Sequence, residues 1–242
     1  KLEAIFEAFL QKNKEAFDKE SNELKKFHVT IAEALFKGAH FSELKKTIDE
    51  YFEEIGSFFD RNKDENISFL YDQLIPYGEM LSTKIIHHCL LHSDVKSAWL
   101  DARKCIKTDS NHQNANVNWP ETSERIDNEM TSLFKSNRVV VSQGFIGSNP
   151  AEMTTTLGRE GSDYSAGIFA YALNAQEVII WKDVPGMLNA DPKYFEDTIK
   201  LEQISFKEAI ELSYYGASVI HPKTIKPLQN KNIPLYVKSF IS

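Results

Sequence analysis

The sequence predicts an α/β fold in which a helical N-terminal layer precedes a mainly parallel sheet. Over roughly the first 90 residues, apolar side chains recur every three or four positions, which is the period of an amphipathic helix. From residue 98 onward, short apolar runs alternate with helical stretches, and this alternation is typical of a parallel sheet covered by helices. The 242 residues, 42% of them apolar, can bury one large core or two smaller ones.

Three amphipathic helices are predicted within residues 1–63. The first carries apolar positions from Leu2 to Leu10, and the second carries them from Leu24 to Leu35. The third is expected to begin near Ser42, a residue type that commonly caps helix N-termini. The Lys and Glu residues between the apolar positions predict solvated outer faces, so this part is interpreted as a helical layer.

A fourth helical pattern, over residues 67–91, is interrupted by the segment Pro76–Gly78, where proline should break and restart the helix. Glu79 is therefore expected in the first turn of the restarted helix. The helix dipole stabilises a carboxylate there with or without a ligand, so capping and ligand binding both stay open. His88 and His92 have the spacing of a metal pair, but no third ligand is in view, and no metal site is predicted.

Short apolar runs predict the strands, which are Ala98–Leu100, Val139–Val141, Val178–Trp181, Ala217–Ile220 and Leu235–Val237. Helices are expected between them, one over residues 126–134, one opened by a capping box at 205–208, and one with Pro222 in its first turn. Because ligands bind beyond the carboxyl ends of parallel strands, the loops after Val141, Trp181 and Ile220 are expected to converge on one site.

The stretch Thr154–Gly167, here called the signature segment, is a hydroxyl- and glycine-rich run that leads into an apolar helix expected to start at Ser162. Such a run leaves backbone N–H groups pointing outward at a helix N-terminus, where negative charge is favoured. Arg159 adds a guanidinium suited to a carboxylate or a phosphate. Asp163, in the first helical turn, would repel an anion unless a cation intervenes. Arg159 and Asp163 together therefore indicate a ligand that carries both a negative and a positive charge. A tight connection without a ligand is the alternative.

The composition excludes several classes of protein. A net charge of −7 argues against a nucleic-acid surface, which needs clustered Lys and Arg. No apolar run approaches the roughly 20 residues of a membrane span, and no signal-peptide pattern is present. Cys89 and Cys105 have neither metal-ligand spacing nor the density of a disulfide scaffold, which predicts a cytoplasmic protein.

From about Leu70 to the C-terminus the chain resembles the catalytic domain of aspartokinases. The segments that carry the resemblance, in the family's order and spacing, are Gly78–Ser82, Gly144–Gly147, the signature segment, Ile180–Gly186 and Gly216–Pro222. The resemblance implies the amino-acid-kinase fold, a three-layer αβα sandwich with a mainly parallel central sheet. It also implies a homodimer that transfers the γ-phosphate of ATP to the side-chain carboxylate of L-aspartate. The product, 4-phospho-L-aspartate, begins lysine, threonine and methionine biosynthesis.

The resemblance assigns roles to individual residues of the amino-acid site. On the matched positions, Arg159 would clamp the α-carboxylate of aspartate and Glu79 would bind its α-ammonium group. Phe145 and Ser162 would shape the pocket, and Asp163 would orient a phosphate-binding lysine. This substrate half is expected to span residues 64–172, after a helical layer formed by residues 1–63.

The nucleotide half is expected to span residues 173–242. By the same resemblance its ATP contacts are Lys182, Asp183, Gly186, Leu188, Lys193 and Ser218. Mg²⁺ would be held mainly through the phosphates, and no metal ligand of the protein is implied.

The chain departs from the family at three of these positions and at Glu160, beside Arg159. Glu160 replaces a glycine, Lys182 a threonine, Lys193 an arginine and Ser218 a lysine. The family's Lys-Phe-Gly-Gly-Thr-Ser strand and its paired ACT domains have no counterpart in the sequence, so we expect a longer polypeptide. Without the lysine of that strand, Asp163 is expected to face the phosphates without a neutralising partner, and residues 1–242 alone are expected to be catalytically silent.

Two other functions fit the residues. One is another kinase of the same fold, acting on glutamate, acetylglutamate, carbamate or a nucleoside monophosphate, although pairing Glu79 with Arg159 favours a free amino acid. The other is a non-catalytic amino-acid sensor or assembly subunit, a reading that Glu160 and Ser218 favour.

Overall fold

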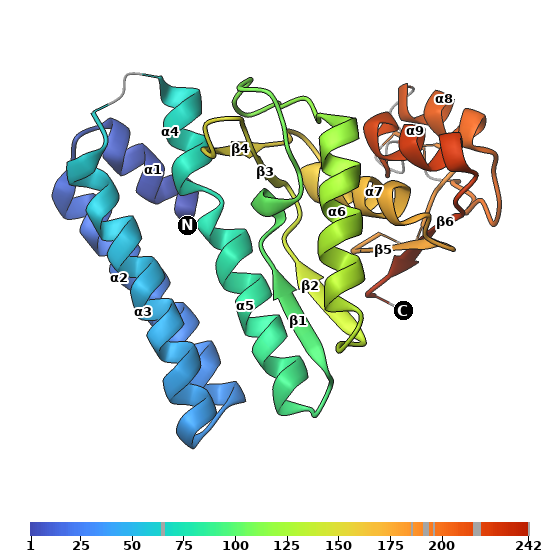
Figure 1. Ribbon diagram of the computed structural model, residues 1–242. Coiled ribbons are helices and arrows are strands. Elements are labelled where there is room, and N and C mark those ends of the chain that lie inside the picture. The colour runs from blue at the N-terminus through green and yellow to red at the C-terminus, as the bar shows by residue number, and fades with distance from the viewer. Residues whose placement is uncertain (64–65, 185, 191–193, 196, 215–218, 242) are drawn as a thin grey trace.

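The computed structural model describes residues 1–63, 66–184, 186–190, 194–195, 197–214 and 219–241. Among the described residues, five helices precede the first strand, and later helices alternate with the strands. The first three helices form a layer at one side of the molecule (Figure 1). The C-terminal elements lie at the opposite side. Within the described residues no helix is long and apolar enough to cross a membrane.

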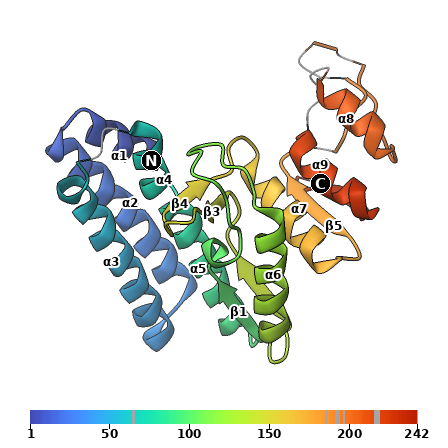
Figure 2. The same cartoon turned by 45° about the horizontal axis from the view of Figure 1, so that its top comes forward.

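The N-terminal layer consists of α1 (Leu2–Leu10), α2 (Lys14–Leu35) and α3 (Gly38–Arg61). Helices α2 and α3 run side by side as a long hairpin (Figures 1 and 2). Their apolar stripes meet in a core that includes the fully buried Phe17, Leu44 and Ile48. The predicted start of the third helix was wrong, because α3 begins at Gly38 and the Ser42 hydroxyl lies inside it, donating to the Gly38 carbonyl oxygen at 3.2 Å.

The predicted interruption at Pro76 is confirmed. Helix α4 (Ile67–Leu74) ends just before this proline, and α5 (Tyr77–His92) starts just after it. Leu70, Leu74 and Leu81 from this pair complete the core of the helical layer. Glu79 consequently lies in the first turn of α5, as predicted.

The strands pair two by two among the described residues. Strands β1 (Ser97–Leu100) and β2 (Val139–Ser142) are parallel, with Ser97 opposite Val139. Strands β5 (Val178–Lys182) and β6 (Leu235–Ser239) are also parallel, with Val178 opposite Leu235. The predicted α/β class with parallel strands is therefore confirmed.

Helices cover both faces of the β1–β2 pair. The Trp99 indole N–H points to α5, where it donates to the Thr83 hydroxyl at 3.1 Å. Successive strand residues point to opposite faces, and Leu100 belongs to a core that also contains Ile126 and Met130 of α6 (Trp119–Leu133). The strands thus lie between helical layers, as the predicted three-layer αβα arrangement requires.

Two strands were not predicted. Strands β3 (Ile146–Ser148) and β4 (Thr154–Thr156) form an antiparallel pair, and all six residues are buried. The three consecutive threonines are β-branched and suit a strand, although their polar side chains suggested a loop. Of the strand predicted over 217–220, residues 217 and 218 lie outside the described residues, and Val219 and Ile220 are not in a strand.

The C-terminal part has its own hydrophobic core. Helices α7 (Gly161–Leu173), α8 (Phe206–Tyr214) and α9 (Pro222–Lys231) pack with β5 and β6 around Ile180, Ile220 and Leu228. The predicted capping box is present, since the Ser205 N–H and hydroxyl both donate to the Glu208 carboxylate, at 2.8 and 2.7 Å. Pro222 occupies the first turn of α9, as predicted.

Candidate functional site

The signature segment forms the end of one strand, a turn and the start of a helix. After β4 the chain turns through Gly158 and Arg159, and α7 begins at Gly161, one residue before the predicted start. The N-cap position is occupied by Glu160, which adopts the left-handed conformation with φ 54° and ψ 31°, and it makes no side-chain capping bond. Ser162 is exposed in the first turn rather than capping the helix.

Asp72, a fully buried carboxylate on α4, anchors the signature segment. It accepts hydrogen bonds from the Thr156 hydroxyl at 2.7 Å and the Thr156 N–H at 3.1 Å. It also accepts the Gln113 N–H at 3.1 Å and lies 2.8 Å from His112 Nδ1. The network joins α4, β4 and the loop around residue 113. Sequence reasoning missed Asp72, although a carboxylate between the apolar residues Leu70 and Leu74 was an available signal.

Two glycines bring the predicted pocket residues together. A Cβ added at Gly144 would lie 2.8 Å from Ser162 Cα, and a Cβ at Gly161 would lie 2.7 Å from Phe145 Cδ2. The Phe145 N–H also donates to the Ser165 hydroxyl at 2.9 Å. The turn between β2 and β3 therefore packs directly on the N-terminus of α7, with Phe145 and Ser162 adjacent.

Asp163 forms an ion pair with Lys182, in which Lys182 Nζ lies 2.7 Å from Asp163 Oδ2. Lys182 Nζ also donates to the Val219 carbonyl oxygen at 2.5 Å. The two side chains are 17% and 21% exposed, so the pair is largely shielded but can be reached from solvent. The expectation that Asp163 lacks a neutralising partner was wrong, because the lysine that replaces the family's threonine lies at the end of β5 and pairs with it.

Glu79 is half-buried in the first turn of α5, and burial raises the pKa of its carboxyl group. Among the described residues its carboxylate has no cationic partner. Its carbonyl oxygen accepts the Thr83 hydroxyl at 2.7 Å, and that hydroxyl accepts the Gln143 amide at 2.9 Å. This relay places the first turn of α5 beside the end of β2, next to Gly144.

Arg159 is exposed and lines a pocket of about 460 Å³. The other residues that line it come from the end of α8 and the start of α9, and they are Ser213, Tyr214, His221, Pro222, Lys223 and Lys226. Glu79, Phe145 and Ser162 are not among them. The structure thus places Arg159 next to this group of cations and Glu79 in another part of the site, beside the β2–β3 turn.

The predicted nucleotide contacts are only partly placed. Gly186 has φ 136° and lines a second pocket, of about 690 Å³, formed with residues 200–206 and 234–238. Asp183 is exposed next to Lys182, and Leu188 pairs with Lys200 in an isolated antiparallel bridge. Lys193 and Ser218 lie outside the described residues.

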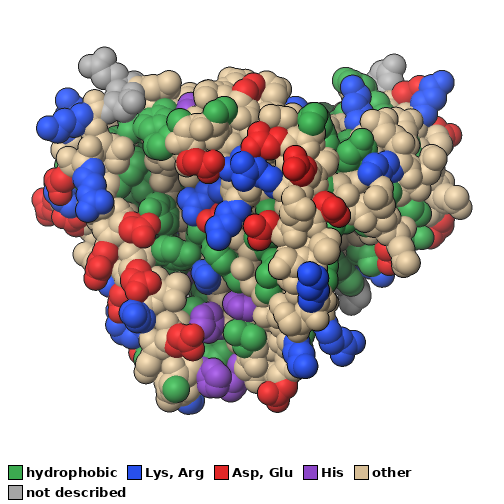
Figure 3. Space-filling model, viewed as in Figure 1, with side chains coloured by type: hydrophobic (Ala, Val, Ile, Leu, Met, Phe, Trp, Pro, Cys, Tyr) green, Lys and Arg blue, Asp and Glu red, His purple; other side chains and the backbone are tan. Residues whose placement is uncertain are grey.

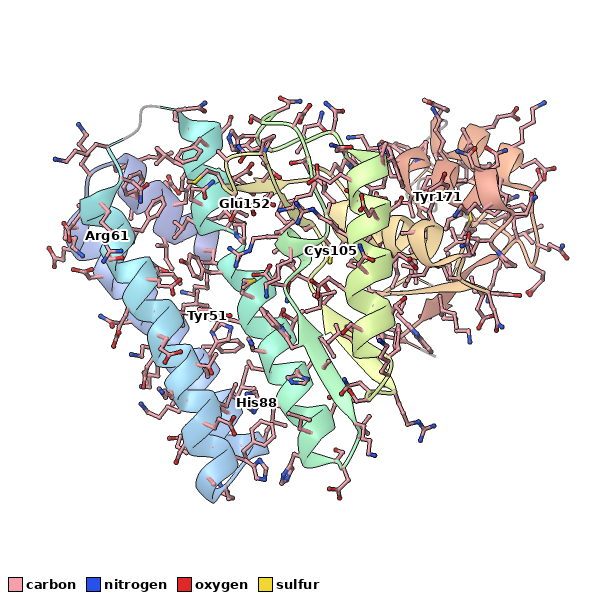
Figure 4. All side chains as sticks on the ribbon, viewed as in Figure 1. Tyr51, Arg61, His88, Cys105, Glu152 and Tyr171 are labelled. Atoms are coloured by element: carbon pink, nitrogen blue, oxygen red, sulfur yellow. The ribbon has the colours of Figure 1, made fainter. Side chains whose placement is uncertain are left out.

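His88, His92 and the two cysteines do not line these pockets. Histidines gather at the lower end of the face shown in Figure 3. The rings of His40 and His92 pack on each other, with their centroids 4.9 Å apart. In the described part of the chain no group of three or more His, Cys, Asp or Glu residues is placed to hold a metal ion. Cys105 lies in the central core (Figure 4), and burial raises the pKa of its thiol to about 12.

Comparisons with known proteins identify relatives that match most of this chain. The lysine-sensitive aspartokinase 3 of Escherichia coli is 38% identical over 170 residues, a match that covers 70% of this chain and 38% of the relative. The bifunctional aspartokinase/homoserine dehydrogenase 2 of Arabidopsis thaliana is 32% identical over 172 residues, covering 71% of this chain and 19% of the relative.

The solved structure of E. coli aspartokinase III in complex with aspartate and ADP superposes with a TM-score of 0.85 at 30% identity. That match covers 97% of this chain and 53% of the solved one, so the chain spans about half of its structural relative and less of its curated ones. The sequence model described as the amino acid kinase family matches residues 10–239. The chain therefore belongs to the amino acid kinase family.

Proposed function

We propose that the protein is an aspartate kinase, which transfers the γ-phosphate of ATP to the side-chain carboxylate of L-aspartate to give 4-phospho-L-aspartate. The observation that carries the proposal is the ion pair between Asp163 and Lys182, which fixes an ammonium group where β5 ends and α7 begins. The relatives support the choice of substrate, since they are named aspartokinases and one was solved with aspartate and ADP.

The reaction needs charge neutralisation more than proton transfer. The side-chain carboxylate of aspartate is already ionised at neutral pH, so its attack on phosphorus requires no general base. It requires that two anions be aligned and that charge on the transferred group be offset. Lys182 would supply one positive charge, and Asp163 would keep the flexible Lys182 side chain in place. Mg²⁺, held mainly through the ATP phosphates, would supply further positive charge when bound.

The amino-acid end of the substrate would be held by groups of opposite charge. Glu79 is a half-buried carboxylate without a cationic partner among the described residues, and an α-ammonium group beside it would offset the cost of its burial. Arg159, exposed and free of hydrogen bonds in the described structure, would bind the α-carboxylate. Phe145 and Ser162, adjacent at the start of α7, would shape the pocket around the bound amino acid.

The nucleotide would contact the loop that follows β5. We propose contacts at Asp183, Gly186 and Leu188. The nucleotide contacts at Lys193 and Ser218 stay predictions from the resemblance. By this proposal residues 64–172 bind the amino acid and residues 173–242 bind the nucleotide. Both halves follow the helical layer of residues 1–63 in the chain. The homodimer remains a prediction from the resemblance, and the cytoplasmic location remains a prediction from the two cysteines.

Trapping of the acyl phosphate with hydroxylamine tests the proposal. The full-length protein is incubated with Mg·ATP and a panel of amino acids, and hydroxamate is measured. We expect product with L-aspartate, and we expect Lys182→Gln to lower the rate by about 10² to 10³, as the loss of one charge-stabilising donor commonly does. Lys207→Gln is the matched control, because Lys207 is an exposed lysine on α8 outside both pockets.

Each other result of this experiment contradicts the proposal. Product with a different acid would identify another kinase of the same fold. An absence of product with any acid, in a protein that still binds amino acids, would identify a non-catalytic sensor.

A further inference from the structure

The pocket beside Arg159, here called the cationic pocket, contains a concentration of positive charge in an acidic protein. Arg159, Lys223 and Lys226 line it together with His221, and no Asp or Glu is among the described residues that line it. The protein as a whole has a net charge of −7. Three permanent cations sharing a pocket of about 460 Å³ repel one another unless an anion lies between them.

Two of the segments that line the pocket, the start of α9 and the signature segment, are fixed to one another through the loop before α6. Lys223 Nζ donates to Asn114 Oδ1 at 2.5 Å, which ties α9 to the loop before α6. That loop packs on the signature segment, since a Cβ at Gly158 would lie 3.0 Å from Asn114 Oδ1 and 2.9 Å from the Gln113 carbonyl oxygen. Gly158 has φ +79°, a conformation that also favours glycine. Lys223 is thus positioned by the fold rather than free on the surface.

The start of α9 adds to the positive potential. His221 is the N-cap of this ten-residue helix, and its Nδ1 accepts the Lys223 N–H at 3.1 Å. The N-terminus of a helix carries partial positive charge from its unpaired N–H groups. Lys226, one turn further along, is exposed and forms no ion pair in the described structure.

We infer that the cationic pocket binds a phosphoryl group, and that Lys223 and Lys226 are its ligands. Two lysines and a helix N-terminus balance a phosphoryl dianion, which leaves Arg159 to balance the single charge of a carboxylate. The inference deepens the proposed function and rests on it. In a kinase the phosphoryl group could belong to the nucleotide, to the acyl phosphate product or to free phosphate.

The position of the pocket suits this role. The Val219 carbonyl that accepts Lys182 Nζ lies two residues before His221 in the chain. Lys182 in turn pairs with Asp163, four residues after Arg159. A phosphoryl group in the cationic pocket would therefore lie next to the Asp163–Lys182 pair, where the transfer is proposed to occur.

Isothermal titration with inorganic pyrophosphate, inorganic phosphate and ADP tests the inference without turnover. We expect Lys223→Gln and Lys226→Gln each to weaken pyrophosphate binding by about five- to tenfold at low salt, an effect that shrinks as salt rises. Lys207→Gln on the neighbouring α8 should bind pyrophosphate as the unmodified protein does. Thermal melting of each variant checks that it remains folded.

The three ligands distinguish the sources of the phosphoryl group. Weaker ADP binding in both lysine variants would assign the pocket to the nucleotide. Weaker binding of phosphate and pyrophosphate with unchanged ADP affinity would assign it to the product or to free phosphate. Unchanged affinity for all three ligands in both variants would overturn the inference, whatever the outcome of the hydroxamate assay. A protein that binds these anions but makes no hydroxamate would contradict the proposed kinase activity alone.

Discussion

Replacing Glu160 by glycine should stabilise the protein. Glu160 is the N-cap of α7 and has φ 54° and ψ 31°, a left-handed conformation in which its Cβ crowds the backbone. Its Oε2 atom is buried and has no hydrogen-bond partner. Glycine adopts this conformation without steric cost and brings no carboxylate, so Glu160→Gly removes both unfavourable features.

The size of the effect follows from four contributions. Relief of the left-handed conformation should contribute about 1 to 2 kcal/mol, and removal of the unpaired carboxylate oxygen about 1 kcal/mol. Against these, glycine makes the unfolded chain more flexible, at a cost of about 0.5 to 1 kcal/mol. Loss of a negative charge at a helix N-terminus costs about 0.3 to 1 kcal/mol more. The net gain should be about 1 kcal/mol, or about 2 to 4 °C in melting temperature for a chain of this length.

Thermal unfolding followed by circular dichroism measures this gain. Glu160→Ala is the matched control, since alanine removes the carboxylate but keeps the Cβ in the left-handed conformation. We expect the alanine variant to melt close to the unmodified protein and the glycine variant to melt above both. A glycine variant that melts at or below the alanine variant would refute the argument that backbone strain at Glu160 is costly.

Three further substitutions probe the anchor, the substrate pocket and the turn beside it. Asp72→Asn should destabilise the fold by about 3 kcal/mol, measured by urea unfolding, because a buried carboxylate that accepts four hydrogen bonds is replaced by a group that cannot accept them all. Glu79→Gln should abolish aspartate binding yet raise stability at neutral pH. Burial raises the Glu79 pKa, so its ionised form destabilises the folded state as pH rises through the ordinary glutamate range, and the advantage of the variant should vanish below about pH 4. Gly144→Ala should lower the free energy of unfolding by about 1 to 3 kcal/mol and raise the KM for aspartate, because the alanine Cβ would lie 2.8 Å from Ser162 Cα. An unchanged KM would show that Ser162 does not line the pocket.

Local patterns predicted the elements whose cause is local. The break at Pro76, the capping box at Ser205 and the parallel strands around Val139 and Val178 follow from backbone chemistry and apolar runs. The β3–β4 pair escaped prediction because its threonines are buried by tertiary contacts that no local pattern displays, such as the bonds of Thr156 to Asp72 and of Thr155 to Thr108.

The same distinction holds for the candidate site. The signature segment identified Arg159 and Asp163 as charged groups at a helix N-terminus, and that placement follows from sequence. The partner of Asp163 could not be predicted from the sequence, because Lys182 reaches Asp163 from a strand 19 residues further along the chain. Lys223 and Lys226 were likewise missed, since α9 meets Arg159 only after the chain has folded.

The position of the hydroxamate on aspartate tests the central claim most directly. The full-length protein is incubated with Mg·ATP, hydroxylamine and L-aspartate labelled with ¹³C at its side-chain carboxyl carbon, and the product is examined by NMR. If Glu79 holds the α-ammonium group and Arg159 the α-carboxylate, the side-chain carboxylate alone meets the γ-phosphate, and the labelled carbon should carry the hydroxamate. A hydroxamate on the unlabelled carboxyl carbon, or none at all from a protein that binds both substrates, would contradict the account.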